Sequence, residues 1–383
     1  MQAAAMTHLQ AVKPSAERIA DFCAAEGAAE RVGNGWVYDA LCGWTLVNAW
    51  RAGSIDGSRG FYHYDAPLPG AVDRPRRVVN SRGLPCRIHS FGDSFTHCDQ
   101  VSDGETWQEF LAGHIQEPVK NFGVGGYSVH QACTRMERVE LGPETATHII
   151  LNIYDDDHFR NLDALRSIRS PGTGQPFTLP HLRVEPNTRV IEERPNLIAD
   201  RAAVWQLRDD AFLLEHFGDD PTLRAVLGAT ASDADRAAAV EASRNNVNFG
   251  IDGAAAAGHT ALALASSRHV VAKVAALCEK IGAKLLVVLS FSQPVMAAAL
   301  RGEPGFDRSF VDWLSAQPFR SVDMREAFVA KFARSNLEAD AFLKPFFIGH
   351  HTPLGNFLTA HALKDAVVQW LGEPKPAPYA GKL

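Results

Sequence analysis

A repeated order of strand, short turn and helix is the feature of this sequence that most constrains its fold. The run Lys284–Phe291 is almost entirely apolar, which is typical of a strand buried on both faces of a parallel sheet. Expected strands cover residues 86–91, 118–122, 147–154, 284–291 and 320–323. Expected helices cover residues 103–114, 127–141, 260–281, 310–314 and 352–371. This alternation predicts an α/β protein with three layers, in which helices cover both faces of a parallel sheet.

Two regions lie outside the alternation. Residues 1–85 begin with an amphipathic helix over 15–31, for which Ser15 is a candidate cap, and continue as an irregular apron rich in Gly, Pro and aromatic residues. Residues 163–258 start with a Pro/Gly segment, continue with a candidate hairpin over 177–190, and include Ala-rich helical pieces such as 231–247. We therefore expect a discontinuous core over 86–162 and 259–372, an insertion or lid over 163–258, and a tail over 373–383.

Composition narrows the class of protein. The net charge is −6 and no basic block occurs, which argues against nucleic acid as a partner. The N-terminus lacks a signal-peptide pattern, and no uninterrupted apolar run of membrane-spanning length occurs. The cysteines have no CxxC spacing and indicate reduced thiols; they are residues 23, 42, 86, 98, 133 and 278. We expect a cytoplasmic protein that acts on a small molecule, with no nucleic-acid or membrane partner.

The block Phe91–Thr96 carries the strongest chemical signal. Ser94 stands where a strand gives way to a helix, so its backbone N–H points the same way as the helix N-terminus and can bind negative charge. This is the layout of a nucleophilic serine with half of an oxyanion hole attached. Gly-Asp-Ser is also ordinary turn chemistry, so the block needs support from the rest of the chain.

Three further blocks follow predicted strands or precede the last helix. Asn121–Ser128 contains three glycines, which permit close approach of the backbone to a ligand. The strand 148–154 ends in Asp155–His158, and Gly349–Asn356 places His350 just ahead of a helix. Together the four blocks supply a serine, a glycine amide, a polar strand tip and a histidine, which are the parts needed for acyl transfer to serine.

These blocks resemble the SGNH/GDSL hydrolase superfamily, which comprises ester hydrolases with a flavodoxin-like α/β/α fold. The resemblance covers residues 36–162 and 284–371, and its motif residues are Phe91–Thr96, Val101, Trp107, Asn121, Gly123, Gly126, His350, Pro353 and Gly355. It implies that Ser94 is the nucleophile, that His350 is its general base, and that the amides of Ser94 and Gly126 bind the oxyanion. It implies no cofactor and no metal.

Two positions depart from the family pattern. The Asn that completes the oxyanion hole falls on Asp156, whose carboxylate cannot donate a hydrogen bond unless it is protonated. Either Asp156 is held protonated, or Asn152, His158 or Asn161 takes its place, or the reaction makes no oxyanion here. Asn121 of the glycine block is a further candidate to bind the oxyanion or the substrate.

The triad acid is the second departure, because its position falls on Phe347 or Ile348, and neither side chain can orient an imidazole. Either a carbonyl group takes this part, or a carboxylate comes from elsewhere, with Asp323 and Asp340 as candidates. His351 also competes with His350 for the place of the base, although the spacing to Gly355 favours His350.

Other functions use the same residues. The carboxylates of 155–157, with His158 and His97, His130 or His350, offer ligand types suited to a divalent cation. Consecutive side chains at a strand end alternate in direction, however, so the three carboxylates cannot all converge on one ion. An acyltransferase could use the same acyl-Ser94, and a retired hydrolase could only bind a ligand. The sequence favours a hydrolase of carboxylic esters, with Arg135, Arg160 and the insertion as candidates to shape its pocket.

Overall fold

The chain divides into two compact units. The computed structural model describes residues 2–24, 36–46, 49–55, 58–64, 75–171, 175–185, 187–229 and 253–372. The first unit contains residues 1–28, 37–45 and 158–269, and the second contains residues 29–36, 46–157 and 270–383. The second unit carries the predicted nucleophile and base, and the first unit includes the segment expected to be an insertion.

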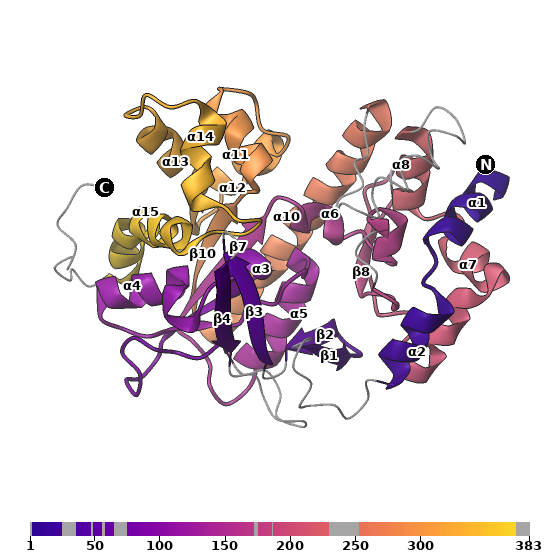
Figure 1. Cartoon of the computed structure of the whole chain (residues 1–383), viewed down its shortest axis with the longest axis horizontal. Coiled ribbons are helices and arrows are strands. Elements are labelled where there is room, and N and C mark those ends of the chain that lie inside the picture. The colour runs from indigo at the N-terminus through magenta and orange to yellow at the C-terminus, as the bar shows by residue number, and fades with distance from the viewer. Residues whose placement is uncertain are drawn as a thin grey trace. The chain divides into compact units, whose positions relative to one another are not determined.

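An all-parallel sheet of five strands forms the centre of the second unit (Figure 1). The strands are β5 (Ile88–Phe91), β6 (Val119–Asn121), β7 (His148–Tyr154), β10 (Lys284–Ser290) and β11 (Arg320–Asp323). They lie in the order β6-β5-β7-β10-β11, and Lys284 to Ser290 pair in register with His148 to Tyr154. Every residue of β7 is buried, as expected for a central strand covered on both faces. All five strands predicted from the sequence are therefore confirmed.

Helices cover both faces of this sheet. The main ones are α4 (Trp107–Ile115), α5 (Val129–Glu140), α10 (Gly253–Ile281) and α15 (Pro353–Leu371). The crossover from β5 to β6 runs in the opposite direction to that from β6 to β7, so right-handed connections place α4 and α5 on opposite faces. Phe110 of α4 packs edge-on against Phe357 of α15, and Lys273 of α10 pairs with Glu137 of α5 at 3.4 Å. The predicted α/β architecture is thus confirmed.

Several shorter helices belong to the second unit. They are α3 (Ser94–His97), α11 (Gln293–Leu300), α12 (Arg308–Ser315), α13 (Met324–Phe332) and α14 (Ala339–Leu343). Of these, only α12 was expected from the sequence. The others are short, and an apolar periodicity needs a longer window to be recognised.

The first unit is built from short elements around aromatic side chains. Its helices are α1 (Gln2–Val12), α2 (Ala16–Ala24), α6 (Asp157–Arg160), α7 (Asp210–Phe217) and α8 (Pro221–Ala229), and its strands are β1 (Trp36–Asp39), β2 (Gly43–Leu46), β8 (His181–Val184) and β9 (Ile191–Arg194). Phe177 contacts Phe22, Tyr38 and Trp44, with ring centroids 5.3 to 6.0 Å apart. The predicted cap is confirmed, since Ser15 Oγ accepts a hydrogen bond from the Arg18 N–H at 3.2 Å.

The structure corrects or refines three expectations about these outlying segments. The described residues 36–46, 49–55 and 58–64 are not irregular, because β1 pairs with β2, and β3 (Ala49–Ile55) forms an antiparallel pair with β4 (Ser58–Tyr64). Backbone groups make such ladders, so they form without the alternating side-chain pattern that the sequence lacks here. The predicted hairpin is the antiparallel pair β8–β9, displaced a few residues from the expected bounds. The helix expected over 231–247 and the tail over 373–383 lie outside the described residues.

One helix bears on the expectation about membranes. Ala257–Ile281 is long and apolar enough to cross a membrane by length and composition, although charged residues such as Arg268 and Lys273 interrupt its apolar sequence. Slightly more than half of its most apolar stretch (56%) is buried inside the protein, and core helices commonly pass the same test.

All six cysteines are free.

Candidate active site

Ser94 begins α3 directly beyond the end of β5. Asp93 caps this helix, because its Oδ1 accepts the Phe95 N–H at 2.9 Å, and its Oδ2 accepts the Ser94 hydroxyl at 3.2 Å. The strand order reverses between β5 and β7, and ligands of open α/β sheets bind outside the carboxyl ends of the strands at such a point. Ser94 therefore stands at the topological switch point of the sheet.

The turn before Ser94 accepts no side chain at Gly92. Its φ is +152°, and an added Cβ would lie 2.2 Å from Thr96 Oγ1 and 2.5 Å from the Asn152 carbonyl oxygen. This close approach fixes α3 against β7. Gly92 and Asp93 thus set the position of Ser94, the candidate nucleophile.

The glycine-rich loop lies against α3. The Val124 N–H donates to the Gly92 carbonyl at 3.1 Å, and an added Cβ at Gly123 would lie 2.2 Å from the His97 nitrogen. At Gly125 an added Cβ would be 3.7 Å from the Cβ of Ser94. Gly126, the expected oxyanion donor, follows in the same turn with a φ of +80°. The loop named from the sequence therefore reaches Ser94, the candidate nucleophile, and Gly123 is required for its close approach to α3.

Asn121 and Asn152 hold α3 in place. Asn121 Nδ2 donates to the Thr96 carbonyl at 2.8 Å, while its Oδ1 accepts the Gly123 N–H at 2.9 Å. Asn152 Nδ2 donates to Thr96 Oγ1 at 3.0 Å, and its Oδ1 accepts the Ser290 hydroxyl at 2.6 Å. Both side chains are buried, so these bonds position the helix that carries Ser94.

The acidic tip of β7 is organised by local bonds. Asp155 Oδ2 accepts the backbone N–H and the hydroxyl of Ser292 at 2.9 and 2.6 Å, and Asp157 Oδ2 accepts the Tyr154 N–H at 3.0 Å. Asp156, which stands where the resemblance expects Asn, is half-buried between these two aspartates.

The two other substitutes belong to the first unit. The His158 ring bonds to Ser267 Oγ at 2.8 Å, and Asn161 Nδ2 donates to the hydroxyls of Ser266 and Ser267 at 3.1 and 2.9 Å. The two side chains thus bond to serines of α10 within their own unit.

His350 contacts Gln100, a residue that lies outside the sequence blocks predicted to form the site. Gln100 Oε1 accepts the His350 backbone N–H at 3.1 Å and lies 2.8 Å from His350 Nδ1. An atom that accepts from a backbone N–H must be the amide oxygen, which fixes the orientation of the Gln100 amide. The same oxygen can only accept from Nδ1, so Nδ1 carries the proton and Nε2 keeps its lone pair.

The imidazole of His350 also packs against the residue that follows Ser94, the candidate nucleophile. Its ring centroid is 5.2 Å from that of Phe95, the residue directly after Ser94, and Phe95 stacks on Tyr154 at 4.4 Å. Among the described residues, Ser94 and His350 share no direct hydrogen bond, because the hydroxyl donates to Asp93 instead. Proton transfer to His350 therefore requires the Ser94 side chain to turn away from Asp93.

His351 has a different environment from its neighbour. It is buried against Phe95, Phe328 and Phe347, with ring centroids 4.9 to 6.4 Å away. Burial, together with the neighbouring His350, lowers the pKa of His351 to about 3, so its ring is neutral at physiological pH. Of the two candidate bases, half-buried His350 is the one with access to solvent.

The candidate triad acids do not occupy the position beside His350 Nδ1. Asp323 caps α13 and forms an ion pair with Arg325 at 2.6 Å, at the far edge strand of the sheet, while Asp340 is exposed on α14. Gln100 fills the position instead. The expected partners of the His350 ring are carboxylates and the residues just before it in the sequence. Gln100 is neutral and lies 250 residues away from His350.

Neither a metal cluster nor a known relative adds to this site. Among the residues that the structure describes, no group of three or more His, Cys, Asp and Glu side chains is placed to hold a metal ion. No family model matches the chain, and a search of curated proteins finds no similar sequence.

Proposed function

We propose that this chain is a serine hydrolase that cleaves a carboxylic ester of a small molecule through an acyl-Ser94 intermediate. The observation that carries the proposal is the meeting of two distant segments: His350, from the loop before the last helix, packs on Phe95 beside Ser94. Its Nδ1 is hydrogen-bonded and its Nε2 is left as the basic atom. A serine next to a histidine of fixed tautomer is the arrangement that activates a hydroxyl as a nucleophile.

The sheet order supports the resemblance to SGNH hydrolases. Numbered along the chain, the five strands lie in the order 2-1-3-4-5, which is that of flavodoxin-like sheets. In such sheets the site lies between strands 1 and 3, and here Ser94 follows strand 1. The proposal therefore extends to an SGNH-type core with Ser94, the glycine loop and His350 as its functional blocks.

The reaction follows from these positions. Ser94 Oγ attacks the ester carbonyl carbon as its proton passes to His350 Nε2, and the departing alcohol takes that proton as the C–O bond breaks. Water then attacks the acyl carbon with His350 again as base, and the proton passes from His350 to Ser94 Oγ as the bond between Oγ and the acyl carbon breaks, which releases the carboxylic acid. The N–H groups of Ser94 and Gly126 are the proposed oxyanion donors, and removal of one such donor typically costs ~10²–10³ in rate.

Intact-mass labelling with a small fluorophosphonate tests the proposal directly. The wild-type protein should gain one adduct, and Ser94→Ala should gain none. Ser292→Ala is a matched control, because Ser292 also follows a strand and donates its hydroxyl to an aspartate, here Asp155 at 2.6 Å. It should label at the wild-type rate.

Hydrolysis of p-nitrophenyl acetate separates the related functions. Turnover in water together with a Ser94-dependent adduct supports the hydrolase. An adduct with acyl-enzyme accumulation but no turnover in water would favour acyl transfer instead. Absence of any adduct on folded wild-type protein between pH 6 and 9 would overturn the proposal.

A further inference from the structure

Gln100 makes an unusual contact with the proposed base. One oxygen of a neutral amide accepts both the backbone N–H and the ring Nδ1–H of His350, at 3.1 and 2.8 Å. In a serine–histidine–acid triad, a carboxylate holds the imidazole in the correct tautomer and stabilises its charged form. An amide oxygen can do the first of these but carries no negative charge for the second.

The segment that presents Gln100 adopts a conformation that needs outside support. Cys98 and Gln100 have φ angles of +61° and +75°, values that residues other than glycine seldom adopt. Such backbone conformations are unfavourable and persist where surrounding contacts over-determine them. Because two of the three residues 98–100 are left-handed, we expect other parts of the protein to hold this segment in place.

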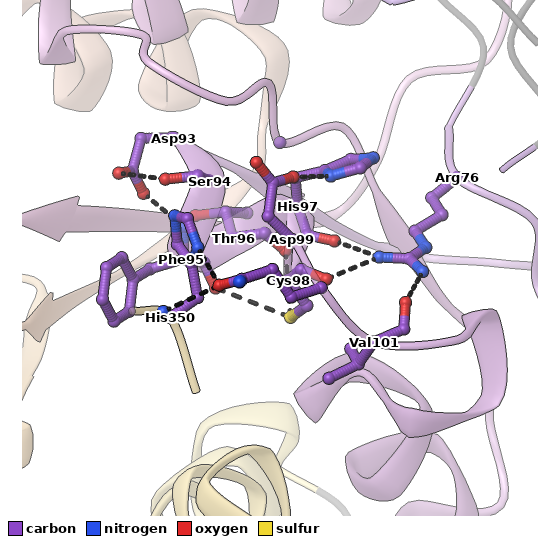
Figure 2. Close-up of polar contacts among 12 residues, drawn as sticks. Arg76, Asp93, Ser94, Phe95, Thr96, His97, Cys98, Asp99, Val101 and His350 are labelled. Atoms are coloured by element: carbon purple, nitrogen blue, oxygen red, sulfur yellow. Dashed lines mark hydrogen bonds and ion pairs between the residues drawn. The ribbon is translucent and has the colours of Figure 1, made fainter. Parts of the chain in front are cut away.

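Arg76 provides that support. Its side chain is buried and donates to the carbonyl oxygens of His97, Cys98 and Val101 at 2.5 to 2.9 Å (Figure 2). Its Nε also pairs with Asp103 at 2.8 Å. The guanidinium thus binds the carbonyls on both sides of Gln100 and fixes the loop between α3 and the following turn.

Gly349 allows the approach from the other side. Its φ is +103°, and an added Cβ would lie 3.2 Å from Gln100 Oε1. A side chain at this position would be strained by the backbone and would crowd the amide oxygen. Both partners of the contact are therefore shaped for it, one by an arginine clamp and the other by a glycine.

We propose that Gln100 is a positioning residue that replaces the triad acid and fixes His350 in the Nδ1–H tautomer without adding charge, held in place by Arg76. This inference rests on the proposed function for its catalytic meaning, since His350 acts there as the base for Ser94. The contact itself, and the tautomer that it fixes, can be measured without any catalysis.

The first test reads the tautomer. Nitrogen-proton correlation spectra of the histidine rings, with the His350 signals assigned by their loss in His350→Gln, should show the Nδ1–H form in the wild-type protein. Gln100→Ala should give a mixture of both tautomers, whereas Gln317→Ala, a control amide at the end of α12, should leave the signals unchanged. A wild-type His350 in the Nε2–H form would overturn the inference.

The second test reads the rate and its pH dependence. Gln100→Ala should lower the rate of fluorophosphonate labelling about 10²-fold, the typical cost of a misplaced catalytic group, with an unchanged midpoint of thermal unfolding. Gln100→Glu should restore most of that rate and move the acid limb of the labelling profile about one unit to higher pH, because a carboxylate beside the ring favours its protonated form. The other titratable groups on the segments that contact His350 are unchanged in these variants; they are Asp93, His97, Asp99, Asp103 and His351.

The outcomes separate the two proposals. If wild-type protein fails to label but Gln100→Ala still releases the fixed tautomer, the hydrolase function fails while the positioning role of Gln100 stands. If wild-type protein labels and Gln100→Ala labels equally fast with the tautomer retained, the positioning role fails while the hydrolase function stands.

Discussion

The carboxyl ends of β5 and β11 have the same local arrangement, an aspartate that caps a helix, but the second carboxylate oxygen binds a different group at each end. Each strand runs into an aspartate that caps a helix and accepts the N–H two residues later at 2.9 Å: Asp93 accepts from Phe95, and Asp323 accepts from Arg325. At β5 the second carboxylate oxygen accepts the Ser94 hydroxyl. At β11 the corresponding oxygen binds the Arg325 guanidinium at 2.6 Å.

At the β11 end two carboxylates, Asp323 and Asp307, share the guanidinium of Arg325. Arg325 also pairs with buried Asp307 at 2.7 Å and lies over the Phe291 ring at 4.1 Å. Burial lowers the pKa of Arg325, but its bonds to Asp323 and Asp307 outweigh this effect and raise it. A pocket of about 480 Å³ lies beside this network, and Asp307, Asp323 and Arg325 contribute to its lining. A cavity lined by mutually paired charges is a structural feature, whereas the β5 end offers a hydroxyl and an imidazole.

The largest effect that we expect tests the structural role of the β11 end. Arg325→Met should destabilise the protein by about 3–5 kcal/mol, because it leaves the buried carboxylate of Asp307 without its cation. Urea unfolding monitored by circular dichroism measures this loss. Fluorophosphonate labelling of the folded variant should keep its wild-type rate. A large drop in labelling at full occupancy of the folded state would show that the two strand ends are functionally coupled.

The equivalent change at the β5 end should act on the site. Asp93→Ala removes the cap of α3, the helix that begins at Ser94, so the backbone that carries the proposed nucleophile loses its fixed position. We expect the labelling rate to fall about 10²-fold, with a stability loss of about 1–2 kcal/mol from the missing cap. Asp323→Ala is the matched control, since it removes the same kind of cap from α13 and should leave labelling unchanged. Equal effects of both variants on labelling would contradict the distinction between the two ends.

The sequence predicts the sheet well because its information is local. The runs 148–154 and 284–290 are predominantly apolar, and strands of this kind have few alternatives inside an α/β chain. Gly92 and Gly123 can also be read from the sequence as turn residues. The structure explains both, because close contacts leave no room for a side chain at either position. The helix α3 cannot be read in this way, since four residues are too few to show a periodicity.

The partner of His350 could not be predicted for a different reason. The contact between Gln100 and His350 joins residues 250 positions apart and depends on two left-handed backbone conformations and on a buried arginine. None of these has a local sequence signature, and a search for carboxylates selects Asp323, which the structure pairs with Arg325. Sequence pattern thus predicts which segments meet at the candidate site, and only tertiary contacts show which of their side chains touch.

The smallest effect that we expect concerns His351, which lies between the two ends by packing against Phe95 of α3 and Phe328 of α13. Its pKa is lowered from 6.5 to about 3 by burial, so the unfolded chain binds a proton below about pH 6.5 that the folded protein does not bind until about pH 3. Stability is therefore lost as the pH falls through this range. The wild-type protein should lose about 2 kcal/mol of stability from this group between pH 7 and pH 5.

Replacement of His351 by a neutral side chain should remove that contribution. His351→Gln should show a shallower fall in stability between pH 7 and pH 5 in urea unfolding, by the same ~2 kcal/mol, even if its stability at pH 7 is reduced by imperfect packing. His361→Gln, a change at a half-buried histidine on α15, serves as the control and should keep the wild-type slope. An unchanged slope in His351→Gln would mean that the His351 ring accepts its proton in the folded protein as readily as in the unfolded chain. The aromatic contacts linking the two strand ends would then be open to water rather than closed around a neutral imidazole.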